Sequence, residues 1–533
     1  MILSKIASAI RRLYLEMPRP SSRSCQVPRA ILMACSIVAA MATIHAAAAD
    51  ISEYAVRTYG GATVKTLADL ISFPSVADES MPNKNNPHFK AMTEYLQQTA
   101  GELGFEFVDY GDVVVIGLGR SEKRLGLIVH ADVQPADSSK WAKSPFTLDT
   151  QTEPGLLIGR GTEDDKGPIA AALYAMKALK DRHVPLTRRI ELIISYSEES
   201  DWNPFISFLA QNPPPDLNVV LDAEFPVVVA EKGWCSFTIA LKPPAGRPSE
   251  IDAPTLTNFE GGAFLSQVPE DASAVITHAD SRLPARLKSG ADADKEATFT
   301  FQSHGDRLIV RARGVSAHSG SPQDGVNAIT HLAELLARET WPPSMAANMA
   351  RFIHDMVGPG YFAERFGHLA YGDPFMGPLT LSLGVLKERN GALEAEINLR
   401  RPLGKTSQEV EKEIRDAISA WQQKSGIELA VNDLFVSDPY DARTAPHVPI
   451  LMEIFKHETG ISDAKPISIG GGSHARLVPN GVCYGPVMPG EPYTGHSEHE
   501  SISRDRLMLA LKIYTAMAER LAGPDAVAGS THR

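Results

Sequence analysis

Hydrophobic runs of strand length alternate with segments of helical period over much of the chain. Leu125–Val129, Arg189–Ser195 and Asn218–Leu221 are apolar runs that predict buried strands. Between the first two, Pro168–Lys180 predicts a helix, because its apolar residues recur on one face: Ile169, Leu173, Met176 and Leu179. Strands that alternate with helices in this way are typical of an α/β fold.

The last part of the chain is also largely helical in pattern. Thr406 and Glu409 carry the signature of a capping box. This box would open a helix whose apolar face holds Val410, Ile414, Ile418 and Trp421. Arg504–Leu521 predicts a final helix, and the small and polar residues of 522–533 predict a flexible tail.

The middle of the chain lacks this rhythm. From Phe237 to Leu403 the sequence shows turns rich in Lys, Pro and Gly, alternating strands at Thr298–Gln302 and Arg307–Arg311, and a helix from Val326. We interpret it as an α+β domain inserted into the first domain. The predicted organisation is therefore 1–49 leader, 50–237 first part of the catalytic domain, 238–403 inserted lid domain, 404–521 second part of the catalytic domain, and 522–533 tail.

Residues 1–49 have the composition of a secretory signal peptide. Six basic side chains and one acidic one precede or flank an uncharged stretch, Ala30–Ala49, that ends in four alanines. This pattern predicts export, to the periplasm or the medium, with cleavage after Ala49. An uncleaved membrane anchor is the alternative, because twenty uncharged residues could span a bilayer. The start could also be Met17, since the region before it is longer than a signal needs.

Composition narrows the class of protein further. The chain has 533 residues and a formal net charge of −12, which argues against nucleic acid or an anionic membrane as a partner. Only four cysteines occur, so neither a disulfide scaffold nor a cysteine-rich zinc protein is expected. Cleavage would leave Cys235 and Cys483, which could pair, although a buried free thiol is the expected state of each.

Candidate chemistry is concentrated in five short segments: His130-Ala-Asp132, Gly161–Gly167, Ser197–Ser200, Asp222-Ala-Glu224 and the segment around His496. Three of them directly follow predicted strands. Open α/β sheets carry functional groups at the carboxyl ends of their strands, so these three segments should meet at one edge.

Imidazole and carboxylate ligands without thiolates suit zinc or a similar divalent ion. One histidine and one carboxylate for each ion, with a further carboxylate shared, would make a two-metal site. Adjacent glutamates could divide the work, one binding metal and the other taking a proton from water. The chain has neither the Gly-x-Ser-x-Gly elbow of serine hydrolases nor a His-Glu-x-x-His helix.

Single motifs of this kind are weak. A second His-x-Asp, His278-Ala-Asp280, also follows apolar residues, and we assign it to the inserted domain without a metal role. Two adjacent acidic residues are usually a solvated face or a cap. The order of the five segments carries the prediction.

The chain resembles the dinuclear zinc peptidases that include aminoacylase, glutamate carboxypeptidase, succinyl-diaminopimelate desuccinylase and bacterial dipeptidase V, and it is most similar to the dipeptidase V branch. The resemblance covers nearly all of the chain after the leader. The matching segments are His130–Pro135, Gly159–Pro168, Ser197–Ser200, Asp222–Pro226, Ser316–His318, Asn398–Arg400 and Gly470–Arg476. It implies a catalytic domain with a mixed sheet and helices on both faces.

The resemblance also implies roles for the metal site. Asp164 would bridge two ions, His130 and Asp222 would complete one, and Glu199 and His496 the other. Glu198 would be the general base, and Asp132 would bind the second ring nitrogen of His130. The peptide bond after Asp164 is expected to be cis. His499 is an alternative to His496 as a ligand.

The inserted domain would supply substrate contacts. His318 would reach the oxyanion of the tetrahedral intermediate, and Arg400 would bind the terminal carboxylate of the substrate in a bidentate pair. Arg476 would add a contact. An ordinary loop histidine and a surface arginine are the alternatives, and Arg401 competes with Arg400.

The implied function is that of an exported metallopeptidase that hydrolyses dipeptides. Asp rather than Glu at position 222 is similar to the aminopeptidase and dipeptidase members, and a large inserted domain is similar to the monomeric branch. Zinc is the expected metal, although manganese and cobalt suit the same ligands. An N-acyl amino acid amidohydrolase and an inactive peptide-binding module are the alternatives. Neither nucleic acid nor, after cleavage, a membrane is expected as a stable partner.

Overall fold

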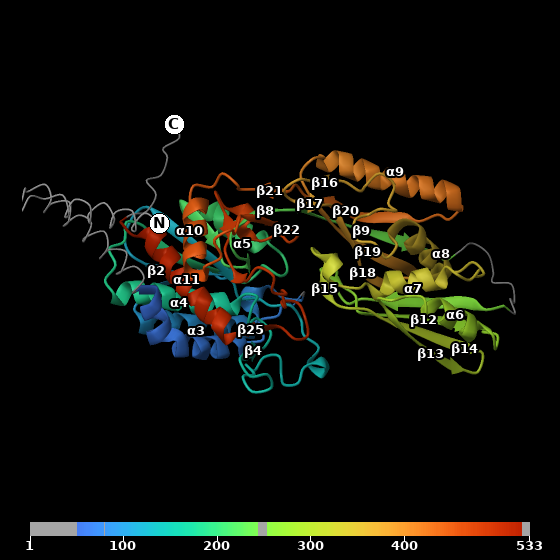
Figure 1. Cartoon of the computed structure of the whole chain (residues 1–533), viewed down its shortest axis with the longest axis horizontal. Coiled ribbons are helices and arrows are strands. Elements are labelled where there is room, and N and C mark those ends of the chain that lie inside the picture. The colour runs from blue at the N-terminus through green and yellow to red at the C-terminus, as the bar shows by residue number, and fades with distance from the viewer. Residues whose placement is uncertain (1–50, 79, 244–252, 525–533) are drawn as a thin grey trace, which may run out of the picture. The chain divides into compact units, whose positions relative to one another are not determined.

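The computed structural model describes residues 51–78, 80–243 and 253–524. The predicted signal peptide and most of the predicted tail lie outside these residues. Within the described part, no helix combines the length and the apolar character that crossing a bilayer requires. Contacts join the described residues into one unit, which has two large sheets and several two-stranded ones (Figure 1).

The first sheet is mixed and has nine strands. Its main path runs in the order β1 (Glu106–Asp109), β2 (Val113–Leu118), β5 (Arg189–Ser195), β3 (Arg124–His130), β6 (Leu217–Val220), β23 (Val482–Cys483), β8 (Val228–Glu231) and β21 (Tyr440–Asp441), and β22 (Ile467–Ile469) pairs with β8. Strands β5, β3 and β6 are parallel neighbours. Their carboxyl ends therefore meet at one edge, as the strand predictions require.

Helices cover both faces of this sheet. One face packs against the helical residues 51–71 and against α3 (Pro87–Leu103), α4 (Lys166–Asp181), α10 (Val448–Thr459) and α11 (Arg504–Ala522). The other face packs against α5 (Asn203–Gln211) and the short helix η5 (His474–Leu477). Figure 1 shows α4 and α11 side by side. The predicted α/β class, with a mixed sheet and two covered faces, is confirmed.

The second sheet is antiparallel and has eight strands. Their order is β13 (Thr298–His304), β14 (Arg307–Arg313), β12 (Asp271–Thr277), β10 (Thr255–Gly261), β18 (Thr380–Arg389), β19 (Ala392–Arg401), β9 (Gly233–Leu241) and β20 (Ala430–Val436). A separate hydrophobic core forms between this sheet and α6 (Leu283–Ala291), α7 (Ala328–Leu336), α8 (Met345–Phe352) and α9 (Ser407–Ser425).

The second sheet extends beyond the predicted limits of 238–403. It begins at Gly233 and ends at Val436, because β20 pairs with β9. The capping box of Thr406 and Glu409 is present, but the helix that it opens, α9, packs on the second core and not on the first. The apolar face of an amphipathic helix does not show which sheet the helix will cover. The predicted boundary at 403 therefore leaves α9 and β20 out of the second region.

The remaining elements are short. The two-stranded pairs are β4 (Leu156–Ile158) with β25 (Ser501–Ser503), β7 (Ala223–Glu224) with β24 (Pro486–Val487), β11 (Gln267–Val268) with β15 (Ala317–His318), and β16 (Gly372–Asp373) with β17 (Gly377–Pro378). Single turns of helix are η1 (Asn83–Asn85), η2 (Ser138–Lys140), η3 (Pro322–Asp324) and the π-helical η4 (Ile353–Val357). Cys235 and Cys483 are buried free thiols, as expected.

Candidate metal centre and substrate cavity

Four of the predicted side chains lie together at the edge where the parallel strands end. His130 is the last residue of β3, Glu198 and Glu199 follow β5, and Asp222 follows β6. Because β5, β3 and β6 are adjacent and parallel, their ends deliver these groups to one place without any long loop.

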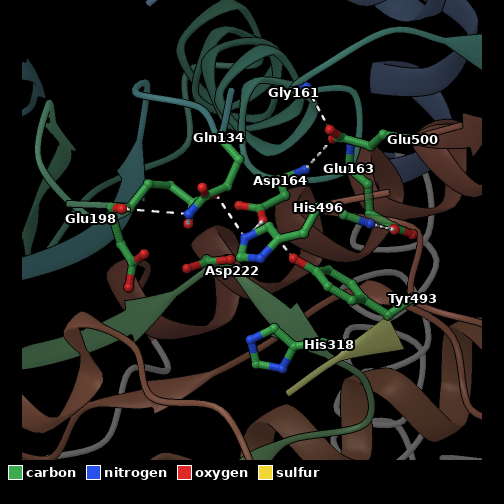
Figure 2. Close-up of polar contacts among 12 residues, drawn as sticks. Gln134, Gly161, Glu163, Asp164, Glu198, Asp222, His318, Tyr493, His496 and Glu500 are labelled. Carbon is green, nitrogen blue, oxygen red and sulfur yellow. Dashed lines mark hydrogen bonds and ion pairs between the residues drawn. The ribbon is translucent and has the colours of Figure 1, made fainter. Parts of the chain in front are cut away.

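Asp164 lies between the two histidines. Asp164 directly precedes Asp165, the N-cap of α4. The Asp164–Asp165 peptide bond is cis, as the resemblance implied. One carboxylate oxygen of Asp164 is 2.8 Å from Nε2 of His130, and the other is 3.2 Å from Nε2 of His496. His496 comes from the loop between β24 and β25 and also contacts Glu199 at 2.9 Å (Figure 2). A carboxylate that faces one imidazole with each oxygen has the arrangement of a bridge.

Two groups of side chains have the composition and spacing of metal ligands. One is His130, Glu198 and Asp222, and the other is Asp164, Glu199 and His496. Within each group the ligand atoms lie within 4.8 Å of one another. Nε2 of His130 is buried and makes no hydrogen bond despite its short distance to Asp164. A buried nitrogen lone pair among carboxylates fits a divalent cation.

The first of these groups differs from the predicted ligand set. It includes Glu198, which the resemblance makes a free base, and it omits Asp164. The distances of Asp164 to His130 and His496 are equally compatible with a bridging role. The division of roles between Glu198 and Asp164 therefore stays a prediction.

Asp132 lies beside His130, but its contacts differ from those predicted. Nδ1 of His130 is 3.0 Å from the main-chain oxygen of Asp132 and 3.5 Å from its carboxylate. The carboxylate instead accepts hydrogen bonds from the amides of Glu198 and Glu199, at 3.0 and 2.9 Å. A carboxylate can accept several amide bonds, and here it fixes the turn that carries both glutamates against the end of β3.

Two buried glutamates that the sequence analysis did not single out join the loops of Asp164 and His496. Glu500 accepts from the amides of Gly161, Glu163 and Asp164 at 2.8, 3.0 and 3.1 Å, respectively. Glu163 in turn accepts from the amides of Thr494 and Gly495, as Figure 2 shows in part. Each glutamate thus holds the backbone of the other loop. The only sign of these two glutamates in the sequence is that each lies within four residues of a predicted metal ligand.

Gln134 and Tyr493 are further neighbours that sequence reasoning missed. The Gln134 amide donates to Oε2 of Glu199 at 2.9 Å, and the Tyr493 hydroxyl donates to Asp164 (Figure 2). Gln134 lies inside the matched segment His130–Pro135, so that segment already contained the signal. Both contacts orient a carboxylate oxygen that a metal would need.

Burial and mutual charge perturb the titration of the cluster. Burial, followed by the charge of Asp222, raises the pKa of Glu198 well above its usual value. Burial lowers the pKa of His496, but Glu199 and Asp164 outweigh it and raise that pKa to about 10. Buried carboxylates that lie close together repel one another and are poorly hydrated. A bound cation would relieve both effects.

His318 faces this cluster from β15, between the two sheets' loops (Figure 2). Its ring centre is 5.4 Å from that of His496. The amide of Gly320 donates to Nδ1 of His318 at 3.1 Å, so the neutral ring carries its proton on Nε2. Burial, followed by the charge of Arg400, lowers the pKa of His318 well below its usual value. The ring is therefore a neutral hydrogen-bond donor.

The three candidate arginines differ in what they contact. Arg476 pairs with Glu231 at 3.0 Å, and Arg401 binds the carbonyls of Ser437 and Lys405 together with the carboxylate of Asp438. Arg400 is 5% exposed and contacts only the neutral Asn398 and Ser319 side chains. Among the described residues, no carboxylate lies within ion-pair distance of Arg400. It is the arginine available to an anion.

A cavity of about 710 Å³ lies beside the two candidate groups of metal ligands and His318. Residues of both sheets' loops line it, including Asp164, Glu198, Asp222, His318, Gly470 and Tyr493. Two side chains that competed with the predicted ones lie outside the two groups. His278 pairs with Asp306 at 3.4 Å, and His499 is exposed.

A mixed α/β sheet that carries two candidate groups of histidine and carboxylate ligands beside the ends of its parallel strands has the arrangement of a metal-dependent hydrolase. The chain belongs to the peptidase family M20/M25/M40, whose model matches residues 126–520. It is a hydrolase of that family.

Named relatives agree with this membership. The Bacillus subtilis protein named "Putative dipeptidase YtjP" is 30% identical over 471 residues, which cover 86% of this chain and 97% of that protein. The Beta-Ala-Xaa dipeptidase of Lactobacillus delbrueckii subsp. lactis is 28% identical over 85% of this chain and 94% of its own length. Human carnosine dipeptidase 1 has the same fold, with a TM-score of 0.55 at 17% identity over 88% of this chain and 97% of its own.

Proposed function

We propose that this protein is a dinuclear zinc dipeptidase that hydrolyses the single peptide bond of a dipeptide. The observation that carries the proposal is the arrangement of Asp164 between His130 and His496, with Glu198 beside them. It is joined by a buried Arg400 that has no carboxylate partner in the described part of the chain. The names of both sequence relatives, which call them dipeptidases, support the same substrate class.

The residues proposed to hold the two ions are His130, Asp222, Glu199 and His496, with Asp164 shared between them. When bound, the ions would polarise the scissile carbonyl and lower the pKa of a water molecule. Zinc suits this set of nitrogen and oxygen donors, and manganese or cobalt could replace it.

Glu198 is the proposed general base. Its carboxylate takes the proton from the attacking water and passes it to the amine that leaves when the peptide bond breaks. The bonds from Asp132 to the amides of residues 198 and 199 support this role, because they hold both glutamates at fixed positions.

His318 and Arg400 are proposed to act on the substrate. The Nε2–H of His318 would donate to the oxygen that becomes negative as the carbonyl is attacked. Arg400 would bind the carboxylate end of the dipeptide in a bidentate pair. Arg476 already donates to the carboxylate of Glu231 and to the main-chain oxygen of Lys232. Its proposed contribution is made through these two residues. Because one chain supplies both halves of this cavity, a monomer would suffice.

Metal analysis combined with a substrate panel tests the proposal. Purified protein should contain two equivalents of metal, and a chelator should abolish hydrolysis of dipeptides such as Met-Ala. Hydrolysis of N-acetyl amino acids at equal or greater rates would favour the amidohydrolase instead. Turnover of neither class with intact metal would favour the inactive binding module.

Glu198→Gln separates the two readings of the first ligand group. If Glu198 is the base, the variant should keep two equivalents of metal and lose about 10²–10⁴-fold in kcat. Loss of one equivalent would make Glu198 a ligand and overturn its assignment.

We also propose export with cleavage after Ala49, supported by the charge pattern of residues 1–49. Amino-terminal sequencing of the protein from the periplasm or medium should begin at Asp50. A full-length protein retained in the membrane fraction would favour the uncleaved anchor.

A further inference from the structure

The cavity is acidic well beyond its metal ligands. Its lining residues include no lysine and no arginine, and His318 is their only basic side chain. Three carboxylates line it in addition to Asp164, Glu198 and Asp222: Glu224, Asp324 and Glu491. Glu491 is neutralised, because it pairs with Arg506.

Glu224 and Asp324 differ from Glu491 in having no cation. Among the described residues, neither side chain has a hydrogen bond or an ion pair with the protein. Glu224 belongs to β7, two residues after Asp222, and Asp324 belongs to η3, shortly after His318. The two carboxylates come from segments about a hundred residues apart in the chain, and both line the same cavity. Glu224 is half-buried and Asp324 is exposed. Two unpaired carboxylates that line one cavity give it a negative potential that favours a cationic group.

The opposite charge lies elsewhere. Arg400 donates to the hydroxyl of Ser319, the residue after His318, and it is not among the residues that line the cavity with Glu224 and Asp324. A dipeptide carries one negative and one positive end. Charge complementarity therefore places its carboxylate at Arg400 and its amino-terminal residue toward Glu224 and Asp324.

We infer that Glu224 and Asp324 are specificity residues that select dipeptides whose amino-terminal residue has a cationic side chain as well as a free ammonium group. Two carboxylates can accept two cations, and lysine or arginine at the amino terminus supplies both. This inference rests on the proposed dipeptidase function and adds the substrate class to it. It also disfavours N-acyl substrates, which lack the ammonium group.

The test compares Lys-Ala, Met-Ala and Glu-Ala, which differ in amino-terminal charge but release the same alanine. With the full chain loaded with Zn²⁺, kcat/KM should follow Lys-Ala, Met-Ala, Glu-Ala, with about tenfold or more between Lys-Ala and Glu-Ala for each carboxylate. The Lys-Ala preference should also weaken as salt is raised.

The double variant E224Q/D324N should reduce the ratio of Lys-Ala to Glu-Ala to within about threefold, because the two charges are gone while the side-chain shapes remain. The ratio is internal to each protein, so partial misfolding does not alter it. Glu388→Gln is the matched control, since Glu388 is an exposed carboxylate at the end of β18 outside the cavity. It should keep both the ratio and the rates.

The outcomes separate this inference from the proposed function. Hydrolysis of all three dipeptides at similar rates, or an unchanged ratio in the double variant, would overturn the specificity role and leave the dipeptidase standing. If no dipeptide is hydrolysed, the dipeptidase proposal fails, and calorimetric binding of the same three peptides then measures the ratio. Equal affinities in that case would overturn the specificity role as well.

Discussion

The first and second sheets contribute to the same cavity in different ways. The first supplies side chains from the ends of adjacent parallel strands, and its loops are joined by Glu163 and Glu500. The region of the second sheet supplies His318, from the separate pair β11–β15, and Arg400, from β19. Neither residue shares a sheet with the proposed metal ligands. The hydrogen bonds of the first region fix the positions of its side chains, and the proposed substrate contacts belong to the second region.

This difference predicts two kinds of mutant. Changes in the first region should remove metal or stability, whereas changes in the second should affect turnover or substrate binding with the metal still present.

Asp164→Asn should be the most damaging single change. It removes the charge that lies between His130 and His496, so both ions should bind more weakly. We expect activity to fall at least as far as the roughly 10⁴-fold upper range for loss of a general base, together with loss of bound metal. Metal content by mass spectrometry checks it. Full retention of both ions would show that Asp164 is not a bridge.

His318→Ala should reduce kcat by about 10²–10³-fold, the usual cost of removing one oxyanion donor. Metal content should not change, because the ring touches no metal ligand through a hydrogen bond in the described structure. Steady-state kinetics on Met-Ala with parallel metal analysis measures both. A variant that loses metal together with turnover would break the division between the two regions.

His447→Gln should change the pH dependence of stability without affecting turnover directly. His447 is buried in the first core, where its Nε2 lies 3.2 Å from the carbonyl of Asn218, and burial lowers its pKa from 6.5 to about 4. Below pH 6.5 the unfolded chain binds a proton that the folded chain does not, so stability falls as pH drops toward 4.

Across this range His447 should cost about 3 kcal/mol in the free energy of unfolding. Urea unfolding at pH 7, 5.5 and 4.5 should show a shallower acid loss in His447→Gln than in the original protein. Parallel pH curves for the two proteins would mean that His447 is protonated when folded.

Arg400→Lys should give the smallest effect. A lysine keeps the charge but loses the bidentate geometry, so KM should rise about tenfold with kcat little changed. The exposed Arg389→Lys is the control, since Arg389 pairs with Glu394 at the surface. An unchanged KM for Arg400→Lys would point to another group as the carboxylate partner.

The same division explains what the sequence could predict. His130, the pair Glu198–Glu199 and Asp222 each stand at or just after the end of a predicted strand. These residues are therefore expected at one edge of the sheet, because neighbouring parallel strands bring their carboxyl ends together. The predicted strand Arg189–Ser195 matches β5 at both ends. Site residues fixed by regular strands are therefore readable from pattern alone.

Other features depend on contacts that no local pattern encodes. The helix of Val410 and Trp421 has a clear apolar stripe, yet only tertiary packing decides that it covers the second sheet. The contacts of Asp132 with two amides, and of Glu500 with three, are between segments far apart in the chain. Buried carboxylates of this kind look like any other acidic residue in the sequence.

The exchange of bonds between Glu163 and Glu500 has a consequence for how the centre would assemble. Each glutamate accepts from the backbone of the opposite loop, so neither Asp164 nor His496 can move far without disturbing the other. Binding of the first ion would then order the residues that receive the second. Occupancy should rise in one concerted step with increasing metal concentration, and apoprotein should lose the geometry of both positions together.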